Sequence, residues 1–211
     1  MNTGAASQAV GSAPEPAGEL GRLLSGPAST IAPRLLGLVL TVGERSGRIV
    51  EVEAYEGPDD PASHAFRGPT ARTEVMFGPP GHLYVYLSYG VHWCANIVCH
   101  PDGVAGAVLL RALEPLTGVD GMWSDRPAAK RETDLASGPG KLCAALGITD
   151  RNNGVDLLDN TAPVRLQRPA DHRSVSGSGF AVGPRIGITK AVDRPWRFGI
   201  ADSPHLSRRF P

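Results

Sequence analysis

Four short runs of apolar and β-branched residues place the strongest limit on what this chain can fold into. They occupy residues 48–55, 82–87, 91–99 and 107–113. Glycine- and proline-rich breaks separate these runs, and Asp102-Gly103 supplies a tight turn before the last one. Runs of this composition, bounded in this way, are typical of β-strands. The pattern therefore predicts strands that pair as an antiparallel meander.

The flanking segments predict short helices and a few more strands around this meander. Glu114-Pro115 is expected to end the strand region, and residues 118–129 favour no single element. No internal repeat is present, so we expect an α+β fold, a single domain with a curved, largely antiparallel sheet flanked by short helices and long loops. The further predicted elements are a short helix in residues 23–40 leading to a strand over 35–42, a helix over 140–147 closed by its glycine, and strands over 183–189 and 196–200.

Length and composition set the extent of this domain. The chain has 211 residues, 41% of them hydrophobic, which is enough to bury one core. Residues 1–20 are rich in Ala, Gly, Ser and Pro and are predicted to be a disordered leader, with the folded domain over 21–211. No apolar run of about 18 residues could span a bilayer, and no secretory signal is recognisable, so a cytoplasmic location is expected.

Cysteine spacing and charge exclude some classes of function. Cys94, Cys99 and Cys143 do not fit a zinc-site spacing or a disulfide framework, so we expect buried thiols and no metal. The formal net charge is zero, which gives no whole-molecule attraction to nucleic acid. Residues 160–211 nevertheless carry nine basic residues against three acidic ones, which predicts either a basic patch or an ordinary solvated surface. The basic residues are Arg165, Arg168, Arg173, Arg185, Lys190, Arg194, Arg197, Arg208 and Arg209.

All four tyrosines of the chain lie between Tyr55 and Tyr89. The two-residue period of a strand places Tyr84 and Tyr86 on one face, where cross-strand packing is the alternative to a binding role. Tyr89 comes after that strand and directly before Gly90, so we expect its side chain to project outward from a turn. Such clustering favours a site that binds a planar ring.

A glutamate and an arginine accompany the tyrosines. Glu53, two residues before Tyr55, would ordinarily be a solvated or salt-bridged strand residue, but beside these rings and the loop residue His64 it is a candidate general base. Arg111 is flanked by apolar residues and needs a partner if it is buried. An inward-facing carboxylate is the natural partner.

Several ordered motifs extend this cluster over most of the chain. They are Glu53-Ala-Tyr55-x-Gly57-Pro58, Ser63-His64, Met76-Phe77, Leu83-Tyr-Val-Tyr86-x-x-Tyr89-Gly90, Cys94-x-Asn96-Ile97, Val108-Leu-Leu-Arg111-Ala-Leu-Glu114-Pro115, Gly138-Pro139-Gly140-Lys141-Leu142 and Pro184-Arg185-Ile186-Gly187. Together they resemble the alkyladenine (3-methyladenine, methylpurine) DNA glycosylase family. The resemblance runs from about Leu23 to near the C-terminus.

The resemblance implies base excision repair by a monofunctional glycosylase. Its substrate would be double-stranded DNA that contains alkylated or deaminated purines, its reaction the hydrolysis of the N-glycosidic bond, and it would need one subunit and no cofactor. By the matching motifs, Glu53 would activate the attacking water and Arg111 would help to hold it.

The resemblance also implies how the base is bound. Tyr55 and Tyr86 would stack on the flipped base, with His64 beside it. Asn96 would crowd the position of a guanine amino group, and Tyr89 would fill the gap that the flipped base leaves in the duplex. The loop over residues 66–72 differs in detail from the more basic loop of animal members, which leaves the lesion range open.

The residue types leave two alternatives from other classes. One is a non-catalytic nucleic-acid binder that stacks bases on the same rings, and the other is a hydrolase of free purine nucleosides. The few lysines, Lys130, Lys141 and Lys190, lie outside the tyrosine cluster in the sequence, which favours a water-using enzyme over one that forms a Schiff base. Neither a phosphate-binding loop nor the zinc motifs of base deaminases are present.

Overall fold

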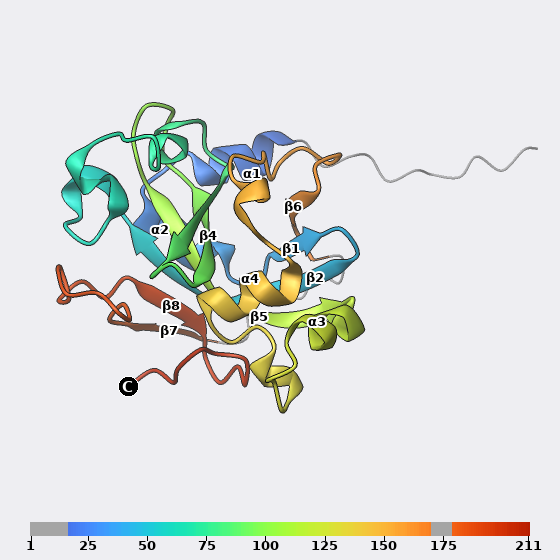
Figure 1. Ribbon diagram of the computed structural model, residues 1–211. Coiled ribbons are helices and arrows are strands. Elements are labelled where there is room, and N and C mark those ends of the chain that lie inside the picture. The colour runs from blue at the N-terminus through green and yellow to red at the C-terminus, as the bar shows by residue number, and fades with distance from the viewer. Residues whose placement is uncertain (1–16, 170–178) are drawn as a thin grey trace, which may run out of the picture.

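The computed structural model describes residues 17–169 and 179–211. In that part of the chain, eight strands form one sheet whose pairings are antiparallel, with α-helices and short 3-10 helices around it (Figure 1). The predicted fold class is confirmed. The strands are β1 (Val39–Val42), β2 (Arg45–Tyr55), β3 (Leu83–Ser88), β4 (His92–Val98), β5 (Ala107–Thr117), β6 (Val164–Gln167), β7 (Phe180–Gly183) and β8 (Arg197–Ile200). The helices are α1 (Ala17–Leu24), α2 (Ala28–Leu35), α3 (Val119–Asp125), α4 (Pro139–Leu146), η1 (Gly57–Asp59), η2 (His64–Arg67), η3 (Glu74–Phe77), η4 (Glu132–Asp134) and η5 (Asp150–Asn152).

Strand β2 organises the sheet because three other strands pair with it. One edge pairs with β5, and the other edge pairs first with β1 and then, at Glu51 to Glu53, with β8. A register shift between Ile49 and Glu51 lets Ile49 and Val52 both join the core although they are three residues apart. The two-residue period then places Glu51, Glu53 and Tyr55 together on the face opposite Val52.

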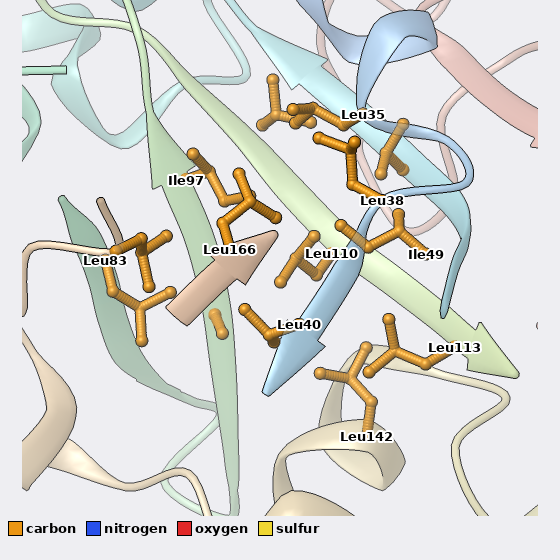
Figure 2. Close-up of a cluster of buried hydrophobic side chains, with 14 of the residues drawn as sticks. Leu35, Leu38, Leu40, Ile49, Leu83, Ile97, Leu110, Leu113, Leu142 and Leu166 are labelled. Carbon is orange, nitrogen blue, oxygen red and sulfur yellow. The ribbon is translucent and has the colours of Figure 1, made fainter. Parts of the chain in front are cut away.

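The main core lies where α2 and α4 pack on the sheet. Both helices are amphipathic enough to bury one side, and aliphatic side chains from α2, α4 and six strands meet there. Figure 2 shows leucine and isoleucine side chains from these elements converging in one cluster. Burial of this apolar surface provides the main driving force for folding. It also supplies a rigid base for the polar face of β2.

Strand β5 continues through Pro115, so the prediction that Glu114-Pro115 ends the strand region is wrong. Glu114 pairs with Arg48, and Pro115 pairs with Gly47. Strand β4 pairs with β5 from Ala107 to Leu109. At Pro115, β5 therefore has one neighbouring strand among the described residues, β2. A proline without an N–H is tolerated at such a position.

Other element boundaries also differ from the predictions. Helix α2 runs through Leu35, so the strand expected over 35–42 begins only at Val39, and the preceding helix is in fact two helices. The strand expected over 183–189 stops at Gly183, because Pro184 interrupts the ladder. Strand β6 was not predicted. In the ambiguous segment 118–129 the chain forms α3.

The structure describes only residues 17–20 of the leader predicted over residues 1–20. Helix α1 begins at Ala17, so residues 17–20 belong to it, while residues 1–16 lie outside the described residues. None of the helices in the described ranges is both long enough and apolar enough to cross a membrane.

Candidate active site

A cavity of about 690 Å³ opens on the polar side of β2, beside β3, β4 and β5. The loops after β2 and β7 complete its walls. Six of the seven predicted site residues line it, and the seventh, Glu53, lies directly beneath through its contacts with Tyr55 and Arg111. The six are Tyr55, His64, Tyr86, Tyr89, Asn96 and Arg111. The fold thus brings together residues that are spread over positions 53 to 111 of the sequence.

Glu53 is a completely buried carboxylate with three donors around it. The hydroxyl of Tyr55 donates to Oε2 over 3.0 Å, the backbone N–H of Ile186 donates to Oε1 over 2.7 Å, and Arg111 Nη1 lies 3.3 Å from Oε1. Burial raises the pKa of this carboxyl above its ordinary value, although the charge of Arg111 and the two hydrogen bonds act in the opposite direction. A carboxylate held in this way binds a proton more tightly than one in water.

Arg111 connects Glu53 with a second buried carboxylate, Glu51. Its Nε lies 3.0 Å from Glu51 Oε1, and its Nη2 donates to the Ser207 hydroxyl over 3.2 Å. Arg197 Nε also donates to Glu51 Oε1, over 2.7 Å. The expected pairing of Arg111 with an inward carboxylate is present, and the guanidinium is held from both sides. Its orientation toward the cavity is therefore fixed before any ligand binds.

The aromatic wall on the β3 side contains one structural ring and one accessible ring. Tyr84 is 1% exposed and stacks on Tyr86 with centroids 5.6 Å apart, so the packing alternative holds for Tyr84. Tyr86 is half-buried and contacts His64 edge-on at 4.5 Å. His64 Nδ1 lies 3.1 Å from the Tyr84 hydroxyl. Desolvation, followed by the charge of Arg72, lowers the pKa of His64, which keeps this imidazole neutral at neutral pH.

Tyr55 also lines the cavity, and Arg185 packs against its ring. The Arg185 guanidinium carbon lies 4.6 Å from the Tyr55 ring centroid and 5.2 Å from that of Trp196. Asp60 accepts from both terminal nitrogens of Arg185, over 2.5 and 2.9 Å. The sequence interpretation missed this role because Pro184-Arg185-Ile186-Gly187 was assigned to a strand. No pattern in this segment identifies the role, because the need for a carboxylate partner follows from the burial of Arg185, which the structure shows.

Asn96 and Tyr89 occupy different depths of the cavity. Asn96 is 5% exposed, and its side-chain amide donates to the carbonyl of Tyr84 over 3.1 Å. Tyr89 is 93% exposed at the tip of the β3–β4 hairpin, where it and Gly90 both have positive φ, 50° and 71°. A non-glycine residue at positive φ is costly and is found more often at functional sites. The expected outward projection of Tyr89 is confirmed.

Cations at the cavity were not anticipated. Arg67, Arg72 and Lys190 all line it, although Lys190 lies outside the tyrosine cluster in the sequence. Arg185 and Arg197 are buried on Asp60 and Glu51, so they cannot contribute to the surface patch predicted for residues 160–211. Of the other basic residues in that prediction, Arg173 lies outside the described residues.

The cysteines are buried and unpaired, as expected. Within residues 17–169 and 179–211, no group of three or more His, Cys, Asp or Glu side chains is placed to hold a metal ion.

Comparison with known proteins gives a consistent result. Residues 22–204 match the family described as Methylpurine-DNA glycosylase (MPG). Three bacterial relatives carry the name "Putative 3-methyladenine DNA glycosylase". That of Nitrosospira multiformis is 53% identical over 180 residues, covering 85% of this chain and 89% of the relative. That of Rhodopseudomonas palustris is 52% identical over 181 residues (86% and 84%), and that of Mycolicibacterium fortuitum 52% over 187 residues (85% and 93%).

Proposed function

Since the chain belongs to the methylpurine-DNA glycosylase family, we propose that it is a 3-methyladenine DNA glycosylase that removes damaged purines from duplex DNA in base excision repair. The resemblance inferred from the motifs is confirmed at the level of the family. The observation that carries the proposal is the buried carboxylate of Glu53 beneath an aromatic cavity of about 690 Å³. A pocket of this size accommodates one flipped purine nucleotide.

The two aromatic walls bind the flipped base. Tyr55 stacks on one side of the purine, and Tyr86 with His64 contacts the other. Flipping costs a few kcal/mol, and base stacking on aromatic rings returns about 1–3 kcal/mol per contact. Stacking therefore offsets most of the cost, and the remainder selects for damaged bases that are already weakly paired. Asn96, at the buried end of the cavity, crowds the position of a guanine amino group.

Glu53 activates the water that attacks the sugar. Among its contacts in the described part of the chain, Oε2 accepts one hydrogen bond, from Tyr55, which leaves a lone pair for a water molecule. The water oxygen bonds to C1′, the N-glycosidic electron pair leaves on the base nitrogen, and a water proton passes to Glu53. Arg111 holds the carboxylate and the water in place. A positioned base of this kind contributes about 10²–10⁴ in rate.

Water rather than a lysine is the nucleophile in this proposal. Lys190 lines the cavity, yet it is exposed at the mouth, while the hydrogen-bonded carboxylate is buried. A lysine becomes an effective nucleophile when it is desolvated or activated by a neighbouring group, and the exposed Lys190 is not desolvated. Borohydride should therefore trap no covalent adduct with lesion-containing DNA, and a trapped adduct would replace this mechanism with a lyase.

The protein acts on double-stranded DNA as one subunit. Tyr89 at the hairpin tip occupies the gap left by the flipped nucleotide. We place this activity in the cytoplasm, on the nucleoid if the source is bacterial, because the substrate is chromosomal DNA.

Incubation with a panel of duplexes tests the function. Strands that carry 3-methyladenine, 1,N6-ethenoadenine or hypoxanthine should become alkali-labile at the lesion, and undamaged duplex should not. A nucleoside hydrolase would release hypoxanthine from free inosine as readily as from DNA. A non-catalytic binder would retain the duplexes without making any site alkali-labile. Either outcome would overturn the proposal.

A further inference from the structure

The lining of the cavity has an excess of cationic side chains. Four cationic side chains line it, Arg67, Arg72, Arg111 and Lys190, and the described lining includes no Asp or Glu. Arg111 is compensated from below by Glu51 and Glu53. Arg72, by contrast, forms no ion pair with any carboxylate in the described ranges.

Arg72 also lies on the ring against which the base is proposed to stack. Its guanidinium carbon is 5.1 Å from the centroid of Tyr86. Its charge acts on the neighbouring His64 as well, where, after desolvation, it is the second cause of the lowered pKa. A base in contact with Tyr86 is therefore within the field of an uncompensated cation. Arg67 lines the same cavity, but no contact of its guanidinium with an aromatic ring is found in the described ranges, so it serves as a comparison for the charge of Arg72.

We propose that Arg72 is a specificity-determining residue that shifts the enzyme toward neutral lesions, such as hypoxanthine and 1,N6-ethenoadenine, and against cationic ones, such as 3-methyladenine. The inference rests on the proposed function, because it requires a flipped purine on Tyr86. Phenol faces alone would favour a cationic base. An adjacent guanidinium opposes that preference by repulsion between like charges.

The charge of the base changes in the same direction in both reactions. A neutral purine takes the electron pair of the broken N-glycosidic bond and leaves as an anion, which Arg72 stabilises. A cationic purine takes the same pair and leaves as a neutral base, so Arg72 does not stabilise its departure. In both cases the water oxygen bonds to C1′ and a water proton goes to Glu53. In direct competition, the ratio of kcat/KM for the neutral lesion to kcat/KM for the cationic lesion should therefore be higher with Arg72 than without it.

Ground-state binding isolates the effect of the charge. In a Glu53→Gln background, dissociation constants are measured for duplexes that carry 3-methyladenine or its neutral analogue of the same shape, 3-methyl-3-deazaadenine. Adding Arg72→Gln should shift the ratio of the two constants roughly tenfold toward the cationic base, as expected for unit charges several ångströms apart in a partly screened site. Arg72→Lys should restore most of the original ratio.

Matched variants distinguish this role from a phosphate contact. Arg67→Gln removes a charge from the same lining and should weaken both complexes equally, with no change in the ratio. In the protein that retains Glu53, Arg72→Gln should lower kcat/KM for hypoxanthine about tenfold more than for 3-methyladenine. If Arg72→Gln behaves as Arg67→Gln does in both assays, the specificity role is wrong although the glycosylase assignment stands. If wild-type protein cleaves none of the duplexes, the proposed function itself has failed.

Discussion

At the scale of the residue, β2 carries two buried carboxylates whose different surroundings give them different roles. Glu51 accepts from Arg111, Arg197 and both the backbone N–H and the hydroxyl of Ser207. Its acceptor capacity is nearly filled, so it serves as the anchor for two guanidinium groups. Glu53 has fewer donors, a raised pKa and a position beneath the cavity. It is therefore the carboxylate that can accept a proton during the reaction.

This difference in role predicts that the same substitution lowers stability much more at Glu51 than at Glu53. Glu51→Gln leaves two buried guanidinium groups short of negative charge and should lower the free energy of unfolding by about 3–5 kcal/mol. Glu53→Gln keeps acceptors for Ile186 and Arg111 and should change it by less than about 1 kcal/mol. Urea denaturation at neutral pH measures both, and a Glu53→Gln loss as large as that of Glu51→Gln would contradict the assignment.

The pH dependence of that comparison follows from the direction of the shift. Folding raises the pKa of Glu53 above its ordinary 4.5, so the folded state binds the proton more tightly than the unfolded state does. Wild-type stability should therefore decline, relative to Glu53→Gln, as the pH rises from 4.5 through the higher folded value. A constant difference across that range would show that Glu53 is not perturbed.

At the scale of the element, Glu56 connects the end of β2 to the start of α2. Its carboxylate accepts from the backbone N–H groups of Ala28 and Ser29, over 3.2 and 2.7 Å, and from His100 over 2.7 Å. Pro27 at the N-cap provides no side-chain cap, so Glu56 supplies one from a distance. Although burial alone would raise it, hydrogen bonds from His100 and Ser29 lower the pKa of Glu56 to about 2.

Removal of this cap should destabilise the protein in a pH-dependent way. Glu56→Ala should cost about 1–2 kcal/mol at neutral pH, as for other lost helix caps. Because the folded pKa is depressed, the contribution is present above 4.5 and is lost as the pH falls toward 2, so the difference from wild type should shrink over that range. Glu44→Ala, at an exposed position, is the control and should change stability by less than about 0.5 kcal/mol.

The β3–β4 hairpin gives a prediction about binding alone. Tyr89→Ala should weaken binding to lesion-containing duplex by about 1–3 kcal/mol, the value of one stacking contact, without affecting thermal stability. Phe180→Ala removes another exposed aromatic ring that does not line the cavity and should leave affinity unchanged. Equal affinities for Tyr89→Ala and wild type, measured by fluorescence anisotropy, would show that Tyr89 makes no energetically important contact with the duplex.

Local patterns predicted most of the central strands and the grouping of the site residues. Composition and turn residues identified β2 to β5, and the resemblance to a known family grouped Tyr55, Tyr86 and Asn96, which line one cavity. What local patterns could not show was contact at long range. The loop after β7 reads as a strand, yet it supplies Ile186 N–H to Glu53 across 133 positions. No periodicity in a single segment contains that information.

At the scale of the whole molecule, zero net charge conceals an uneven distribution. Two of the C-terminal arginines are buried as structural cations, while Arg67, Arg72 and Lys190 lie at the cavity, where the DNA backbone would approach. We expect these three cations to make most of the phosphate contacts, so recognition should depend mainly on the flipped base. The protein is suited to specific capture of lesions more than to tight general binding.

This distribution predicts a shallow salt dependence. With about three phosphate contacts, a plot of log affinity against log salt concentration should have a slope of about −3 or less in magnitude. Titration of undamaged duplex at several salt concentrations measures it. A slope as steep as about −6 would mean that many more cations contact DNA than the cavity provides.

The most direct test of the central claim is a paired measurement on Glu53→Gln with a duplex that carries hypoxanthine. We predict a dissociation constant within about threefold of the wild-type value, because the aromatic walls are intact, and a single-turnover excision rate lower by about 10²–10⁴. Excision at the wild-type rate would contradict the assignment of Glu53 as the base that activates water.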